Sequence, residues 1–259
     1  MLMLYFSGTG NSKYIAELFC KITKAKCHSI EEDIDSQLLA AEKIIAVCYP
    51  VYASRVPKLM REFVASHMEL FKNKCVIIFC TQMAFSGDGA RAFTDLFPPN
   101  HIKVICAEHF FMPNNINNVC ITPLASEKLT RWYLRNSHKR MKAVCKNLSR
   151  RKIKKRGFNS LSQALGLLQG SFFPVIEKWG ASKVKIDNDC NKCMHCFSTC
   201  PVGNFAYSND RIITKNNCML CYRCINSCPK RAVKIIFQTK VKKQFQGVKF
   251  KEGSSHDRN

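Results

Sequence analysis

Two matching cysteine runs, placed 28 residues apart, constrain the fold of this chain more than any other feature. Each run reads Cys-x-x-Cys-x-x-Cys-x-x-x-Cys-Pro. The eight cysteines are Cys190, Cys193, Cys196, Cys200, Cys218, Cys221, Cys224 and Cys228, and the closing prolines are Pro201 and Pro229. Half of the 16 cysteines thus lie in one short segment, which indicates metal sites rather than a disulfide framework. The repeat predicts two similar halves related by a pseudo-two-fold axis.

The spacing within the runs predicts two 4Fe-4S clusters. Two-residue gaps let one tight loop direct three thiolates onto three irons of a cube, and the fourth cysteine of each run serves the other cluster. The expected ligand sets are Cys190, Cys193, Cys196 and Cys228 for one cluster, and Cys218, Cys221, Cys224 and Cys200 for the other. The proline after each fourth ligand fixes the backbone direction. The runs resemble those of the bacterial two-cluster ferredoxins.

A double zinc ribbon is the alternative for these cysteines, because two Cys-x-x-Cys pairs can hold zinc. Tetrahedral zinc has no use for the third regularly spaced cysteine and the proline, so the pattern favours clusters. The other cysteines show no ligand spacing, and most are expected to be buried small apolar residues. They are Cys20, Cys27, Cys48, Cys75, Cys80, Cys106, Cys120 and Cys145.

Short apolar runs alternate with amphipathic stretches from residue 1 to about 110, which predicts an α/β fold with a doubly wound parallel sheet. The expected strands are Leu2 to Phe6, Lys26 to Ile30, Lys43 to Tyr49, Lys74 to Thr81 and Ile102 to His109. The expected helices are Ser12 to Lys24, Pro57 to Leu70, Gly89 to Leu96, and a closing helix from Ser126 to about Leu148. The pattern does not assign a secondary structure to the segment between the second and third strands.

A glycine-rich loop, Ser7-Gly8-Thr9-Gly10-Asn11-Ser12, follows the first expected strand and opens a helix. Its hydroxyls and successive amides at a helix N-terminus suit a phosphate group. The Rossmann fingerprint is excluded because Lys13 takes the third glycine position, and the loop lacks the Gly-Lys-Ser/Thr ending of a P-loop. A plain turn is the alternative.

This loop resembles the FMN phosphate loop of the flavodoxins at Ser7, Thr9, Gly10, Asn11 and Ser12. The resemblance implies a flavodoxin-like sheet of order 2-1-3-4-5, with the ligand at the carboxyl ends of strands 1 and 3. The expected FMN-binding residues are Ser7, Gly8, Thr9, Gly10, Asn11, Ser12, Pro50, Val51, Tyr52, Ala53, Gln82, Met83, Phe85, Gly87 and Gly89.

Within this set, Tyr52 is the expected ring-stacking residue, although it could instead pack under its own loop. Phe85 or Met83 is expected on the opposite face of the ring, and Gly87 and Gly89 would permit close backbone approach to its edge. Many flavodoxins use a tryptophan here, whereas both tryptophans of this chain lie outside these loops.

The combination resembles the fused flavodoxin-ferredoxin proteins of bacteria and archaea, the ferrodoxin-type iron-sulfur flavoproteins. The residues that carry this resemblance are the Ser7 loop, Pro50 to Tyr52, Phe85 to Gly89, Met112 to Asn115 and both cysteine runs. It implies FMN, two 4Fe-4S clusters in a small α+β ferredoxin domain, and anaerobic electron transfer. Joining these groups lets a two-electron partner exchange with a one-electron carrier.

The expected function is therefore electron transfer between external redox partners through the clusters and FMN. The alternative is an FMN-dependent oxidoreductase that acts on a small molecule, with the ferredoxin domain as its electron supply. The histidines are isolated and no carboxylate constellation is present, so no catalytic residue is assigned. A redox sensor is a third reading.

The expected domains are residues 1–149 for FMN, a basic linker at 150–182, a two-cluster domain at 183–238 and a disordered basic tail at 239–259. The linker is expected because Gly157, Gly166, Gly170 and Pro174 break up the segment that follows the basic residues. Within the cluster domain, Phe205 to Thr214 predicts a hairpin around Asn209 and Asp210. Val184 to Ile186 and Val233 to Phe237 are expected to pair as terminal strands.

The formal charge of +23 indicates anionic partners. Basic residues accumulate from Arg131 to Arg156, and no acidic residue lies between Glu127 and Glu177. An acidic electron carrier is the expected partner, peripheral contact with anionic lipid is a further option, and nucleic acid is disfavoured because no binding motif accompanies the charge. With no secretory signal or spanning apolar stretch, we expect a cytoplasmic, thiol-reducing setting.

Overall fold

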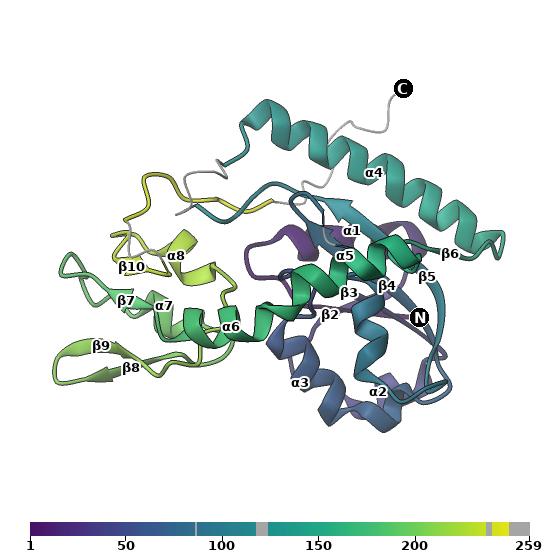
Figure 1. Cartoon of the computed structure of the whole chain (residues 1–259), viewed down its shortest axis with the longest axis horizontal. Helices are drawn as coiled ribbons and strands as arrows, with labels where there is room; N and C mark the ends of the chain where they lie inside the picture. The colour runs from purple at the N-terminus through teal and green to yellow at the C-terminus, as the bar shows by residue number, and fades with distance from the viewer. Residues whose placement is uncertain (86, 118–123, 237–239, 249–259) are drawn as a thin grey trace.

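The computed structural model describes residues 1–85, 87–117, 124–236 and 240–248. Its centre is a six-stranded sheet in the order β2-β1-β3-β4-β5-β6, and every neighbouring pair of strands is parallel (Figure 1). The strands are β1 (Leu2–Tyr5), β2 (Lys26–Ser29), β3 (Ile44–Pro50), β4 (Cys75–Gln82), β5 (Lys103–Phe111) and β6 (Lys154–Lys155). The expected order 2-1-3-4-5 is confirmed, and β6 adds a short sixth strand.

Both faces of the sheet are covered, as parallel sheets require. Successive strand residues point to opposite faces, so Met3 and Tyr5 pack on one side, and Leu2 and Leu4 on the other. The first side is covered by α1 (Asn11–Thr23) and α4 (Glu127–Ser149). The second side is covered by α2 (Ser36–Ala41), α3 (Lys58–Ser66), and the 3-10 helices η1 (Met68–Phe71) and η2 (Arg91–Leu96).

The helices differ from the sequence expectation in detail. The single helix expected over Pro57 to Leu70 is divided at His67 into α3 and η1. The link between β2 and β3 contains α2, which begins where the Asp35 side chain accepts a hydrogen bond from the amide of Gln37 at 2.8 Å. The closing helix α4 begins as expected, because the Ser126 hydroxyl accepts from the amide of Leu129 at 3.2 Å.

The segment 150–182, expected to be a linker, contains β6 and two helices, α5 (Ser160–Ser171) and α6 (Phe173–Ala181). The glycines that suggested a broken structure are instead packing positions. A Cβ on Gly166 would lie 1.8 Å from an Asp88 oxygen, and one on Gly170 would lie 2.4 Å from the Arg55 guanidinium. Only glycine allows the helix to approach this closely, so the segment is part of the packed body.

The cysteine-rich part has the expected small elements. β7 (Lys185–Ile186) pairs antiparallel with β10 (Val233–Lys234), and β8 (Phe205–Ser208) pairs antiparallel with β9 (Arg211–Thr214). The hairpin turns at Asn209 and Asp210, which both have left-handed backbone angles. Two short helices complete this part, α7 (His195–Ser198) and α8 (Arg223–Ser227).

The 28-residue sequence repeat reappears in the backbone. Three pairs of residues at this separation adopt left-handed conformations, namely Lys192 with Leu220, Met194 with Tyr222 and Gly203 with Arg231. A left-handed backbone is uncommon outside glycine, so its recurrence shows that both halves follow the same chain path.

Residues 240–248, expected to belong to a disordered tail, pack against α8. Val241 is buried, and the Gln244 amide donates to the carbonyl oxygens of Cys228 at 2.7 Å and Ile225 at 3.1 Å. The rest of the expected tail, Cys120 and the expected strand end at Phe237 lie outside the described residues. No helix among the described residues is both long and apolar enough to cross a membrane.

His109 on β5 should make the folding stability of the chain depend on pH. Burial lowers its pKa from 6.5 to about 4, with Arg156 and Arg140 adding to the effect, and its Nε2 accepts from the amide of Ala90 at 3.3 Å. His109 binds a proton more readily in the unfolded chain than in the folded one. The contribution of its neutral form to the unfolding free energy is therefore complete above pH 6.5 and is lost as the pH falls toward 4. Between about pH 7.5 and 5.5 we expect a loss of about 1 kcal/mol in unfolding free energy. Urea denaturation at both pH values should show this difference in unfolding free energy, and His109→Gln should reduce it. An unchanged difference in the variant would contradict the assignment to His109.

Candidate functional site

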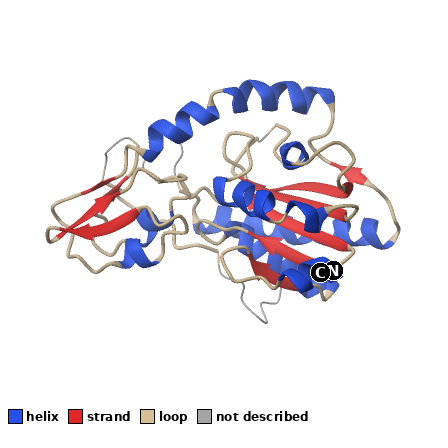
Figure 2. Cartoon of the chain, turned by 90° about the horizontal axis from the view of Figure 1, so that it is seen from below, coloured by secondary structure: helices blue, strands red, loops and turns tan. Residues whose placement is uncertain are grey.

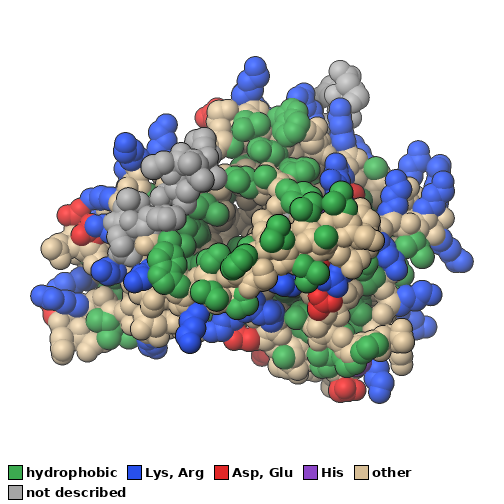
Figure 3. Space-filling model, viewed as in Figure 1, with side chains coloured by type: hydrophobic (Ala, Val, Ile, Leu, Met, Phe, Trp, Pro, Cys, Tyr) green, Lys and Arg blue, Asp and Glu red, His purple; other side chains and the backbone are tan. Residues whose placement is uncertain are grey.

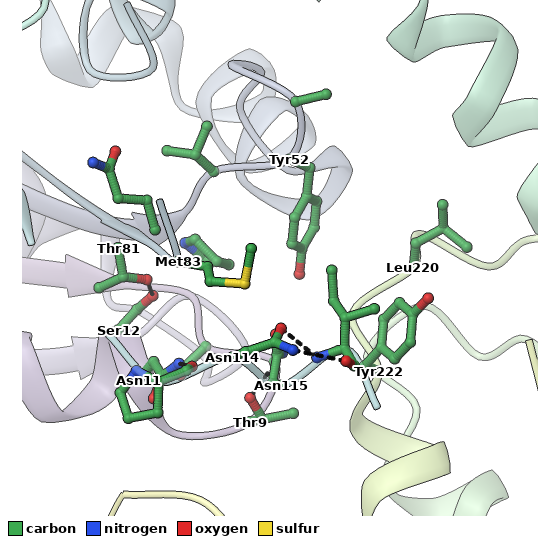
Figure 4. Close-up of a pocket in the computed structure, with 18 of the residues that line it drawn as sticks. Thr9, Asn11, Ser12, Tyr52, Thr81, Met83, Asn114, Asn115, Leu220 and Tyr222 are labelled. Atoms are coloured by element: carbon green, nitrogen blue, oxygen red, sulfur yellow. Dashed lines mark hydrogen bonds between the residues drawn. The ribbon is translucent and has the colours of Figure 1, made fainter. Parts of the chain in front are cut away.

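A cavity of about 270 Å³ lies at the carboxyl ends of β1, β3 and β4 (Figure 4). Four loops form its walls, after β1, β3, β4 and β5. The residues of the expected set that line it are Ser7, Gly8, Thr9, Asn11, Ser12, Pro50, Val51, Tyr52, Ala53, Gln82 and Met83. The carboxyl edge of a parallel sheet is the place where such folds bind ligands.

Four residues of the expected set do not line the cavity. Gly10 is the N-cap of α1, Phe85 is 56% exposed, and the Gly89 carbonyl accepts a hydrogen bond from Tyr49 at 2.8 Å. Gly87 instead meets α5, since a Cβ there would lie 2.7 Å from the backbone of Gly166. The loop after β4 therefore turns toward α5 beyond Met83.

The other lining residues come from four places. Pro113, Asn114, Asn115 and Ile116 follow β5, and Thr81 belongs to β4. Phe173 and Ile176 belong to α6, and Leu220, Tyr222 and Ile236 belong to the cysteine-rich part. The segment after β5 carried a sequence signal in its Met-Pro-Asn-Asn stretch. The residues from α6 and the cysteine-rich part had none, because only the tertiary fold brings them here.

The loop between β1 and α1 is held in place by side-chain hydrogen bonds. The Ser7 hydroxyl accepts from the Gly10 amide at 3.0 Å, and Gly10 takes the left-handed φ of 104° that the turn requires. The Thr9 hydroxyl accepts from Asn115 at 2.9 Å, and the Asn11 amide nitrogen donates to the Pro113 carbonyl at 2.8 Å. The first amides of α1 point toward this loop, which suits an anion.

Two buried polar atoms on the cavity wall have no partner among the described residues: the side-chain oxygen of Asn11 and the hydroxyl of Tyr52. Figure 4 shows the Tyr52 hydroxyl directed into the space beside Met83 and Leu220. Burial raises the pKa of this hydroxyl well above its ordinary value, so it is a neutral donor. Buried polar groups normally make hydrogen bonds, and a polar ligand in the cavity would supply the missing partner for both atoms.

Two further small cavities each combine cysteines from both runs. One is lined by Cys190, Cys193, Cys196 and Cys228, and the other by Cys200, Cys218, Cys221 and Cys224. These are the two ligand sets expected from the spacing. In each cavity one run supplies three cysteines from a loop and a short helix, while the fourth cysteine comes from the other run.

Backbone amides donate to the cysteine sulfurs in a repeated pattern. Leu220 donates to Cys218 at 3.3 Å, as Lys192 does to Cys190 at 3.4 Å. The amides of Ala232 and Asn204 likewise donate to Cys228 and Cys200, at 3.3 and 3.2 Å. Amide hydrogen bonds to ligand sulfurs favour the thiolate and tune cluster potentials.

Among the residues that the structure describes, no three His, Cys, Asp or Glu side chains converge closely enough to bind one metal ion. A 4Fe-4S cube takes each thiolate on a different iron, at separate corners. Burial raises the pKa of the Cys218 thiol to about 12 and of the Cys221 thiol to about 11. Such thiols lose their protons when a cation compensates the charge.

The cavity lined by Cys200 and the second run adjoins the large cavity. Tyr222 lines both, and a Cβ on Gly8 would lie 2.4 Å from the Cys221 carbonyl oxygen. Arg223 joins the two parts: its guanidinium donates to the carbonyl oxygens of Ser7 at 2.8 Å and Gly8 at 3.1 Å. It also forms two 2.7 Å bonds to the Glu31 carboxylate. The loop after β1 is therefore fixed directly to the helix that carries Cys224.

Comparison with known proteins supports the reading of the N-terminal part. The family model described as "Flavodoxin domain" matches residues 2–114, so this part is a flavodoxin-like domain. Reduced Megasphaera elsdenii flavodoxin is 23% identical over 42% of this chain and 85% of its own, with a TM-score of 0.37. Oxidised Flavodoxin 2 from Bacillus cereus is 15% identical over 56% of this chain and 97% of its own, with a TM-score of 0.39. No curated protein matches the chain.

Proposed function

From a flavodoxin-like domain at residues 2–114, we propose that the chain is an electron-transfer protein that holds FMN and two 4Fe-4S clusters. The cluster domain spans residues 183–238. The observation that carries the proposal is the pairing in the two small cavities, where each run of three cysteines meets the fourth cysteine of the other run. This is the ligand arrangement that two-cluster ferredoxins need.

The large cavity supports FMN as the third group. Its loop between β1 and α1 offers hydroxyls and amides to a phosphate, and the unpartnered Asn11 oxygen and Tyr52 hydroxyl suit the polar edge of a flavin. Met83 and Tyr52, which both line the cavity (Figure 4), supply apolar contact. When bound, FMN supplies exchange of one or two electrons, whereas each cluster exchanges one.

The lining residues that the cavities share also indicate the order in which FMN and the two clusters lie along the chain of electron transfer. The cavity with Cys218, Cys221 and Cys224 adjoins the large cavity, called here the flavin cavity, through Tyr222. Among the residues that the structure describes, the cavity with Cys190, Cys193 and Cys196 shares no lining residue with it. An external one-electron partner would meet the distant cluster, whose ligand Cys193 is exposed. The charge of +23 suits an acidic carrier as that partner.

Anaerobic purification followed by iron, sulfide and flavin analysis tests this function. We expect about eight irons, eight sulfides and one FMN per chain. A redox titration should then show electrons passing between flavin and clusters. Zinc in place of iron and sulfide, or a flavin that does not exchange electrons with the clusters, would refute the proposal.

The loop between β1 and α1 should contribute to FMN binding through the phosphate. Thr9→Val keeps the shape of the side chain but removes the hydroxyl that lies on this loop. We expect FMN affinity to fall about tenfold, which is the loss of one charge-assisted hydrogen bond. Riboflavin, which lacks the phosphate, should bind the variant and the unmodified chain alike. Fluorescence titration of both flavins checks this, and Thr23→Val at the far end of α1 is the control; an equal loss for riboflavin would contradict the assignment.

A further inference from the structure

Helices α5 and α6 turn their large apolar side chains outward. Figure 2 shows the pair as an outer layer of the molecule, and Figure 3 shows apolar side chains gathered on the face where Figure 1 places these helices. The exposed apolar residues, called here the outer apolar face, are Leu161, Leu165, Leu167, Leu168, Phe172, Val175, Ile176 and Trp179. Leu161, Leu168 and Val175 are 71%, 66% and 70% exposed, so they protrude rather than form a groove.

The inward sides of the same helices carry mainly small residues, and Phe173 at the start of α6 is the large apolar side chain buried there. Gly166 and Gly170 pack against Asp88 and Arg55, and a Cβ on Gly180 would lie 2.9 Å from Leu220. A helix on a water-facing surface normally buries its large apolar residues and exposes polar ones. In α5 and α6 most of the large apolar side chains face outward and the glycines face inward. A contiguous apolar surface of this kind marks a site of interaction.

The charge around the outer apolar face indicates what covers it. No acidic residue occurs between Glu127 and Glu177, and exposed basic side chains lie directly before α5. They are Arg150, Arg151, Lys152, Lys154, Lys155 and Arg156. A second copy of this chain would bring the same positive charge to the contact and be repelled. Apolar side chains that protrude beside clustered Lys and Arg, with a tryptophan among them, are typical of helices that lie in a membrane interface.

We propose that the outer apolar face docks the protein onto an anionic lipid surface. Leu161, Leu168 and Val175 enter the acyl boundary, while the basic residues before α5 contact the headgroups. Phe173 and Ile176 of α6 also line the flavin cavity, so docking brings that cavity to the lipid surface. The inference is independent of which groups the cavities hold.

Vesicle sedimentation with the full chain tests this. We expect binding to phosphatidylcholine vesicles that contain about one third phosphatidylglycerol to be at least tenfold tighter than to phosphatidylcholine alone, and to weaken with salt. Leu161→Ser with Leu168→Ser and Val175→Ser should weaken it at least tenfold. The matched control is Tyr207→Ser with Ile213→Ser, which removes exposed apolar side chains from the β8–β9 hairpin and should leave binding unchanged.

Two further measurements distinguish docking of the outer apolar face from general electrostatic attraction. In a Trp132→Phe background, Trp179 emission should shift to shorter wavelength on anionic vesicles and be quenched by brominated lipid. Lys152→Gln with Lys154→Gln and Lys155→Gln should weaken binding more than Lys26→Gln with Lys72→Gln and Lys103→Gln, which removes equal charge elsewhere. Equal binding to both vesicle types, wild-type binding by the triple serine variant, or binding to an acidic protein without vesicle binding would overturn the proposal.

Discussion

Cys228→Ser is expected to lower the iron content from about eight to about four per chain, through loss of the cluster held by the other run. Cys228 lies with Cys190, Cys193 and Cys196 around one cavity, although it belongs by sequence to the second run. The spectrum that remains should therefore match that of Cys196→Ser and differ from that of Cys224→Ser. Electron paramagnetic resonance of the reduced, reconstituted variants measures this directly.

Electron exchange with the flavin gives a second measurement for the same pairing. Cys228→Ser should leave the cluster beside the flavin cavity intact, and with it rapid exchange, whereas Cys224→Ser should abolish exchange. Cys75→Ser, which changes a cysteine on β4 outside both cavities, is the control and should keep all of the iron. A Cys228→Ser spectrum that matches Cys224→Ser would show that each run binds its own cluster.

The features that could be predicted from the sequence are those with short-range causes. The apolar run Leu2 to Tyr5 before a glycine-rich loop specifies a buried strand that ends at a helix N-terminus. The alternating pattern predicts the parallel sheet, and the order of its first five strands is the one that the flavodoxin resemblance implies. The paired cysteine cavities also follow from local spacing, since each loop has the same left-handed positions. In these places local geometry and the final fold agree.

The features that could not be predicted depend on contacts between distant segments. Gly166 was read as a break in the chain, but it is the point where α5 touches Asp88, and a sequence does not distinguish a flexible glycine from a packed one. The wall of the large cavity formed by Phe173 and Tyr222 depends in turn on where α6 and the cysteine-rich part dock. Phe85 or Met83 was expected on the opposite face of the ring; Met83 lines the cavity, whereas Phe85 is exposed because its loop turns toward α5.

Arg223→Met is expected to lower the unfolding free energy by about 2–3 kcal/mol and FMN affinity by about tenfold. The guanidinium is the link between the loop after β1 and α8, through the carbonyl oxygens of Ser7 and Gly8 and the carboxylate of Glu31. Removing it leaves the carbonyl oxygens of Ser7, Gly8 and Thr199 and a carboxylate without this partner, which costs more than the pair itself contributes. Both side chains stay about one quarter exposed, which keeps the loss below that of a fully buried pair.

Urea denaturation measures the loss of unfolding free energy, and flavin titration measures the loss of FMN affinity. Electron exchange between flavin and cluster should also slow, because the two cavities are no longer held together. Glu31→Gln keeps a hydrogen-bond acceptor for Arg223 and should cost less than Arg223→Met. Arg211→Met, at an exposed position of β9, makes the same change of charge and is the control. If Arg211→Met lowers FMN affinity equally, the effect comes from net charge. If only Arg223→Met does so, the contact itself positions the loop between β1 and α1, because the Ser7 and Gly8 carbonyl oxygens lose the guanidinium that holds them against α8.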